Sequence, residues 1–342
     1  MSFGKLPVEL CHMILEHLAD QNLLRSASSV ALTCRSLYSV AIPVLYRRSI
    51  KQGDASTFLW AVSNNRASTL MRLVENGANV NQMLQTPFDE PLTPLALAAR
   101  DGQVEIVRCL LAVPGVEWNW ANRDGETPLH LAVMSDETET VRLLLANHKV
   151  SVDAKEGTGR TALSFAAQGR NAVITQLLLD KNPLVDPDSR SNLGSSPLCL
   201  ASDSGSAEIV KLLLDTGRVD VNAVPSTGLT PLIAAIRCAN ADVVRILVSH
   251  PDIDVNLAAI NGRTPISVAA GSGHRELVEL LLAHPSTDPN AADRGGKTPL
   301  LRAAQRRHGR IVSMLLDDAR VGEESRLQLE HWWGKDASPK SQ

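Results

Sequence analysis

The 342-residue sequence predicts an all-α protein, with a short N-terminal three-helix module followed by a solenoid of helix pairs joined by hairpin loops. Three observations predict this fold class. A short phrase recurs every 34 or 35 residues, and the apolar residues inside each copy follow helical spacing. Aromatic residues make up only 3% of the chain, against 44% for all hydrophobic residues. The core must therefore be built from Leu, Ala, Val and Ile, as it is in stacked helices.

The N-terminal segment, residues 1–56, does not follow the repeat and predicts three short helices. The first opens at Pro7 and places apolar residues four apart from Leu10 onward, which is helical spacing. A second helix is expected over 23–30, and a third runs from about 33 to Pro43, where it stops. So short a module is marginal as an independent domain, and such modules often complete their core against a partner.

Each repeat begins with Thr or Ser followed, in most copies, by Pro. The hydroxyl caps a helix and Pro fits the first helical position, where no amide donor is needed. A glycine two residues before most caps favours a turn that needs a positive φ. An alanine five residues after each cap lets neighbouring helices approach closely. The copies begin near Thr57, Thr93, Thr127, Thr161, Ser196, Thr230, Thr264 and Thr298, and the seven complete ones carry Ala98, Ala132, Ala166, Ala201, Ala235, Ala269 and Ala303.

Two helices and a hairpin in about 34 residues resemble the ankyrin repeat. The stretch Thr127–Ala132 is closest to that family's signature, and the resemblance covers residues 57–320. It implies a solenoid whose exposed surface binds another protein. Only one copy, through His130, has histidine at its position, so the hydrogen bonds that this residue makes between ankyrin repeats should be mostly missing. Residues 321–342 are expected to form a C-terminal cap and a disordered tail.

The N-terminal module resembles the F-box through its Leu-Pro start, its apolar spacing and the Cys-Arg stretch at Cys34. The resemblance implies docking onto the Skp adaptor of a Skp–cullin–F-box ubiquitin ligase and thereby onto the cullin core. Many F-boxes carry a tryptophan in the last helix; here Tyr38 or Tyr46 would fill that space. A plain helical cap on the solenoid is the alternative. The implied adaptor-binding residues are Leu6, Pro7, Leu10, Ile14, Leu18 and Leu24.

Charge, hydropathy and cysteine content exclude several other classes. The net charge of −3 argues against a general nucleic-acid binder, and no apolar run approaches the ~18 residues of a membrane span. The five cysteines are scattered and form no CxxC pair, so neither a disulfide scaffold nor a structural metal site is expected. Free thiols indicate a reducing compartment, the cytoplasm or the nucleus.

No catalytic constellation or cofactor motif occurs in the sequence. The run from Gly295 to Thr298 matches the end of a phosphate-binding loop, but Ala291 stands where that motif needs its first glycine. We therefore expect a protein that is not an enzyme and needs no cofactor. An enzyme with a regulatory repeat array is disfavoured because no stretch outside the repeats is long enough for a catalytic domain.

The later copies carry basic residues at positions that are exposed in ankyrin arrays. Trp120 replaces a usually small residue, and core packing and partner contact are equally weighted for it. We hypothesise that the basic half of the surface receives an acidic or phosphorylated segment; ordinary solvated charge is the alternative. The expected target-binding residues are Trp120, Arg237, Arg263, Arg294, Lys297, Arg302 and Arg306.

Together these features predict a substrate-recognition subunit of a ubiquitin ligase. The N-terminal module would hold the ligase and the repeats would hold the target, so that catalysis occurs by proximity. The alternative is an ankyrin-repeat scaffold that acts outside the ligase. Arg302, Arg306 and Arg307 in the last copy are expected to face water as part of a terminal cap.

Overall fold

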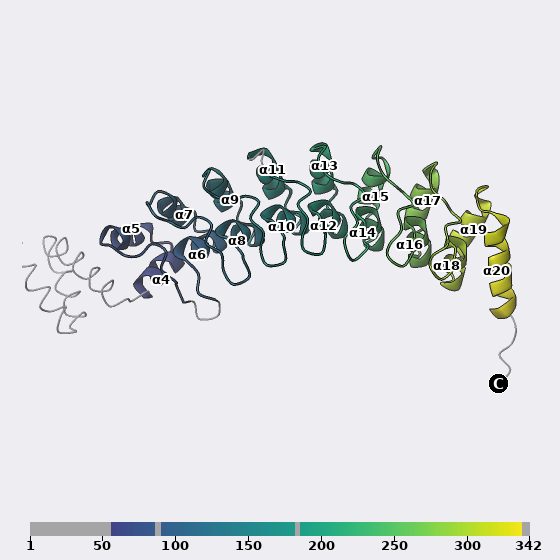
Figure 1. Cartoon of the computed structure of the whole chain (residues 1–342), viewed down its shortest axis with the longest axis horizontal. Coiled ribbons are helices and arrows are strands. Elements are labelled where there is room, and N and C mark those ends of the chain that lie inside the picture. The colour runs from purple at the N-terminus through teal and green to yellow at the C-terminus, as the bar shows by residue number, and fades with distance from the viewer. Residues whose placement is uncertain (1–55, 86–89, 182–184, 337–342) are drawn as a thin grey trace, which may run out of the picture. The chain divides into compact units, whose positions relative to one another are not determined.

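A computed structural model describes residues 56–85, 90–181 and 185–336 of the chain (Figure 1). The three-helix prediction for the N-terminal module, and every expected adaptor-binding residue, lie outside the described residues. The chain divides into two compact units, one ending at Ser151 and the other beginning at Val152. Both units consist of paired helices, which confirms the predicted all-α solenoid architecture.

The described part of the first unit contains three helix pairs. The first helices of successive pairs pack in one layer, α4 on α6 and α6 on α8, and the second helices pack in another, α5 on α7 and α7 on α9. Apolar residues between the layers form the core of the unit. The bounds are α4 Ser56–Ser63, α5 Ala67–Glu75, α6 Pro94–Arg100, α7 Val104–Leu111, α8 Pro128–Met134 and α9 Thr138–Leu145.

The second unit repeats this two-layer arrangement over five described pairs and adds a final helix, α20. Even-numbered helices from α10 to α20 stack in one layer, and odd-numbered helices from α11 to α19 stack in the other. The bounds are α10 Ala162–Gln168, α11 Ala172–Lys181, α12 Pro197–Ser204, α13 Ala207–Asp215, α14 Pro231–Arg237, α15 Ala241–Val248, α16 Pro265–Ser272, α17 Arg275–Ala283, α18 Pro299–Gln305, α19 Gly309–Asp317 and α20 Glu323–Asp336.

The predicted caps start the first helix of most pairs. The hydroxyl of Ser196 accepts a 3.3 Å hydrogen bond from the backbone N–H of Cys199, and Thr230 makes the equivalent bond at 3.2 Å. Thr264 is an exception, since its buried hydroxyl has no hydrogen-bond partner among the described residues. The seven predicted alanines are all buried, at 1% exposure or less, which lets the layers pack closely as expected.

The loops between repeats are tight turns. Among the described residues the only β-type pairing is a single antiparallel bridge between Leu84 and Leu92. In most other loops two backbone bonds close the turn. The N–H of Asp293 donates to the carbonyl of Lys297 at 3.1 Å and the N–H of Gly296 donates to the carbonyl of Asp293 at 2.8 Å, with Gly296 at a φ of +72°. The helix cap follows Lys297 directly, so no strand pairing extends from the turn. The predicted hairpin is therefore reduced to its turn.

Asparagine side chains in the loops that follow the second helices link successive repeats. In the second unit, Asn222 donates to the carbonyl of Asp252 at 2.7 Å and accepts from the backbone N–H of Asp254 at 2.9 Å. Asn256 and Asn290 make the same pair of bonds one and two repeats later. Each bridge satisfies two backbone groups of the next repeat. The link is therefore a property of the stack, which no single repeat could form alone.

The last loop is attached to the preceding repeat by Arg320. Its guanidinium donates to the carbonyls of Leu282 at 2.6 Å and His284 at 3.2 Å, and it pairs with Asp318 at 2.7 Å. Helix α20 then packs on α18 and continues to Asp336, so two residues that we expected in the tail are helical. No helix among the described residues has the length and apolarity needed to cross a membrane.

Candidate protein-binding surface

The turn tips of the second unit form a continuous edge. The backbone N–H of Ser226 donates to the carbonyl of Leu193 at 2.8 Å, which joins the tips of two successive repeats. At the next junction a Cβ added to Gly228 would lie 2.4 Å from the side chain of Ile260, so these two tips are in close contact. Side chains that leave this edge are therefore held at fixed spacing by the backbone.

Three large apolar side chains project from these tips. Leu193 is 61% exposed, Val224 50% and Ile260 52%, and they come from three consecutive turns. We call them the apolar tip row. Exposed apolar residues that occur singly need no explanation, but a row on adjacent tips offers a contiguous contact for a partner. The sequence analysis missed this row, although Leu193 and Ile260 lie inside turns and Val224 directly precedes one, at positions where polar residues are usual.

A group of arginines lies beside the last of these tips. Arg263 directly precedes the cap of α16, while Arg302 and Arg306 lie on the neighbouring helix α18 and at its end. Because α16 packs on α18, the three come together. Burial, and then the positive charges of Arg263 and Arg306, lower the pKa of Arg302. We call these three residues the arginine cluster.

One carboxylate, that of Asp293, forms an ion pair within the arginine cluster. Asp293 forms an ion pair with Arg302, and its side chain is only 2% exposed. The other oxygen of Asp293 accepts from the backbone N–H of Gly295 at 2.8 Å and of Lys297 at 3.1 Å. One oxygen of this carboxylate therefore stabilises the turn, while the other pairs with Arg302. Sequence reasoning did not single it out, since an Asp in a turn is unremarkable until its neighbours are known.

The other expected target-binding residues of the second unit are distributed differently. Arg294 is exposed on the turn before α18, and Arg237 is exposed at the end of α14, with α16 lying between α14 and α18. Lys297 is half-buried and donates to the side-chain oxygen of Gln305 at 2.9 Å. We expected Arg263 and Lys297 at exposed edges; the structure shows that both are half-buried.

Arg302 does not face water as a cap residue would. Its side chain is only 17% exposed, and it is the one charged residue at a position where the other complete copies carry Leu, Phe, Ala or Val. Packing of α18 against α16 and α20 covers its stem, and Asp293 holds its head. The departure from the repeat pattern at this position was a signal available in the sequence.

Trp120 belongs to the first unit. It is half-buried in the loop between α7 and α8. The neighbouring Trp118 is also half-buried, and the ammonium of Lys149 lies 5.7 Å from the centre of its ring. Both indoles therefore keep an accessible part, and the role of Trp120 in binding stays a prediction.

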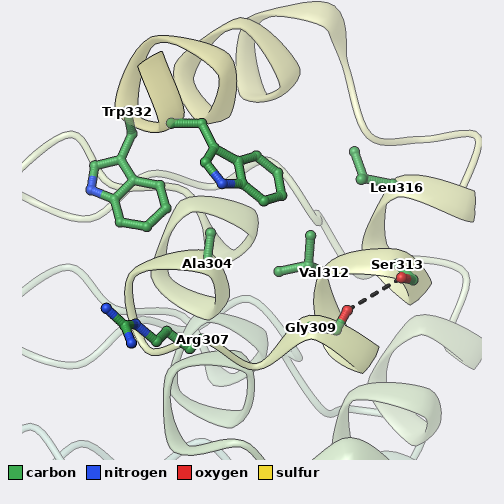
Figure 2. Close-up of a pocket in the computed structure, with 8 residues that line it drawn as sticks. Ala304, Arg307, Gly309, Val312, Ser313, Leu316 and Trp332 are labelled. Atoms are coloured by element: carbon green, nitrogen blue, oxygen red, sulfur yellow. Dashed lines mark hydrogen bonds between the residues drawn. The ribbon is translucent and has the colours of Figure 1, made fainter. Parts of the chain in front are cut away.

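A pocket of about 600 Å³ lies between α20 and the last helix pair (Figure 2). Its walls are apolar on the α19 side, where Val312 and Leu316 lie, and aromatic on the α20 side, which Trp332 and Trp333 supply; Trp332 lies on the side of Ala304 and Arg307. Trp332 is half-buried and Trp333 is 55% exposed. Both tryptophans line this gap and fill it incompletely.

Comparison with known families gives two matches. A model of ankyrin repeats matches residues 58–156, 107–186, 163–259 and 252–325, and a model described as F-box-like matches residues 3–52. Both are non-catalytic binding modules. No curated protein matches the chain.

Among solved structures, the chain is similar to the ankyrin repeat domain of Bcl-3, described as a unique member of the IkappaB protein family. The two chains share 30% sequence identity with a TM-score of 0.56, over 65% of this chain and 98% of that one.

Proposed function

This chain belongs to the ankyrin-repeat family and carries an F-box-like segment before its repeats, and from this premise we propose that it is the substrate-recognition subunit of a Skp–cullin–F-box ubiquitin ligase. The F-box-like segment would bind the Skp adaptor and, through it, the cullin core. The ankyrin array would bind a protein target. The observation that carries the proposal is the presence of these two binding modules in one chain.

The mechanism in this proposal is proximity. The chain breaks and forms no bond; it raises the local concentration of a target lysine near a conjugating enzyme that the ligase core carries. The apolar tip row and the arginine cluster supply the kind of surface that this role needs, a rigid edge with apolar anchors next to positive charge. Trp120, Arg237, Arg294 and Lys297 are proposed as further target contacts.

The proposed location is the cytoplasm or the nucleus. Three cysteines in the described part of the chain are free thiols: Cys109 is half-buried, Cys199 buried and Cys238 exposed. An exposed free thiol such as Cys238 is typical of proteins in a reducing compartment.

The test is co-purification of the full chain with the Skp adaptor. The wild-type chain should retain the adaptor, and the double change Ile14→Ala and Leu18→Ala should abolish retention, because it removes apolar side chains from a core that the partner completes. His17→Ala, a polar position on the same predicted helix, is the matched control and should bind like the wild type.

A second readout separates the ligase subunit from the scaffold alternative. If the wild-type chain folds but retains neither adaptor nor cullin, the ligase proposal is wrong and the scaffold remains. If the double variant still binds, the ligase proposal stands but the expected contact face is misplaced. Thermal unfolding should show that the variant's repeat array remains folded.

A further inference from the structure

We infer that Arg263, Arg302 and Arg306 form a binding site for a phosphorylated side chain of the target. The inference rests on the proposed function, in that the ankyrin array is taken to bind a protein. It narrows that function to a chemical class of ligand and to one place on the array. The argument uses the charge of the cluster, its geometry and its position beside the apolar tip row.

The charge of the cluster is unbalanced. Three arginine cations are served by one carboxylate, that of Asp293, and this carboxylate pairs with Arg302 alone. Two positive charges are thus left without a counter-charge among the described residues. A phosphoryl group at neutral pH carries about −1.5 to −2 charges and would balance them. A single target carboxylate, with one negative charge, would balance only half.

The hydrogen-bond donors point to the same ligand. The Nε atoms of Arg263 and Arg302 are both buried and have no acceptor among the described residues. Buried polar atoms normally have partners, and Asp293 Oδ2, the ion-pair oxygen beside Arg302, is likewise buried without a hydrogen bond. A phosphoryl group offers three acceptor oxygens, and guanidinium groups bind such oxygens in pairs.

The three arginines reach the cluster from different points of the fold. Arg263 comes from the turn before α16, Arg302 from the middle of α18, and Arg306 from its end. Burial lowers the pKa of Arg302, and the positive charges of Arg263 and Arg306, brought close to it, lower it further. The equivalent position is apolar in the other complete copies, so the helix pair itself does not require an arginine at 302.

The surroundings of the arginine cluster favour a peptide over a nucleic acid as the source of the phosphate. The apolar tip row ends at Ile260, on the turn that also carries Arg263. An extended segment lying along the tips would place apolar side chains on the row and a phosphorylated residue at the cluster. The chain's net charge of −3 disfavours a polyanion that must contact many phosphates.

The experiment uses the full-length protein, immobilised, and a degenerate library of phosphoserine and phosphothreonine peptides. The same library without phosphate, and the library with Glu at the modified position, are run beside it. We expect the phosphorylated library to bind roughly tenfold or more tightly than either. The variant Arg302→Leu with Arg306→Gln should lose this preference. Arg310→Gln, an exposed arginine on α19, is the control and should retain it.

Each outcome bears on the inference. If the phosphorylated and Glu libraries bind equally well, the arginine cluster is a site for acidic peptides in general, and the inference of a phosphate site is wrong. Binding that survives the double variant, absent binding, or binding of single-stranded RNA in preference to peptide would overturn it. Arg306→Gln alone changes an exposed residue and keeps the test usable if the double variant fails to fold. Adaptor binding is measured in parallel, so a failure of the ligase proposal is seen separately.

Discussion

The carboxylate of Asp153 accepts a 2.9 Å hydrogen bond from the backbone N–H of Asp186 in the next repeat. Asn222 and its equivalents use their oxygen in the same way and also donate their amide to a carbonyl. A carboxylate cannot donate that second bond. Burial raises the pKa of Asp153, with the negative charge of Asp186 adding to the effect and Arg218 and Lys155 opposing it. The hydrogen bonds between repeats are therefore weaker at Asp153 than at Asn222 and its equivalents.

Replacing Asp153 with Asn should stabilise the protein at neutral pH. The change removes a half-buried charge and restores an amide donor, which together are worth about 1 kcal/mol in the free energy of unfolding. Urea unfolding of the two proteins at about pH 7 measures the difference. The converse change, Asn222→Asp in the same unit, is the matched control and should destabilise. A stability of Asp153→Asn at or below that of the wild type would contradict this account.

The same substitution should alter the pH dependence of stability. Because the folded state raises the pKa of Asp153 above 3.8, the folded protein binds more protons than the unfolded chain just above that value. The contribution of this group to stability is present at low pH and is lost as pH rises through the folded pKa. The gain from Asp153→Asn should therefore be smaller at about pH 4 than at about pH 7. An equal gain in stability at both pH values would show that the charge of Asp153 is not what destabilises the wild type.

Leucine in place of Ala201 should destabilise the second unit. The alanine side chain is fully buried between packed helices, and the extra atoms would force them apart at a cost of roughly 1–3 kcal/mol. Thermal unfolding gives the comparison. Ala283→Leu, at an exposed helix end, should leave the midpoint nearly unchanged. Similar midpoints for both variants would mean that Ala201 is not at a tight contact.

Removing the guanidinium of Arg320 should loosen the C-terminal end. Arg320→Ala loses the bonds to Leu282 and His284 and leaves Asp318 without its partner, for a loss of about 1–3 kcal/mol. Hydrogen exchange of α20 should increase more than that of α14. Arg320→Lys keeps the charge but not the fork of donors, so only part of the protection should return. Unchanged exchange in α20 would exclude this anchoring role.

Target binding on the basic side of the second unit should depend on salt. Reversal of Arg263 and Lys297 to Glu should slow association and flatten its salt dependence between about 0.05 M and about 0.5 M NaCl, because positive charge steers a negative ligand. The phosphorylated peptide library serves as the probe in a surface binding assay. If the association rates are the same for both proteins, or do not change with salt, positive charge does not steer the ligand to this surface.

The amino-acid sequence by itself determined the repeat, its caps and its packing alanines. Each of these rests on interactions within a few residues: a Thr or Ser hydroxyl bonds the helix that it opens, and a glycine such as Gly296 supplies the positive φ of its own turn. The same local chemistry recurs in most copies, so periodicity alone revealed it. The residues that project from the array were also visible, but only as positions on separate repeats.

Only the tertiary structure decided which of those residues meet. Arg263 and Arg302 are 39 positions apart, and they become neighbours because α16 stacks on α18 and carries both stems to one place. The half-burial of Lys297, the pairing of Arg302 with Asp293 and the exposure of Leu193, Val224 and Ile260 on successive loops arise in the same way. They depend on how far each repeat rotates and translates relative to the next, and this is set by packing between helices that no local sequence signal encodes.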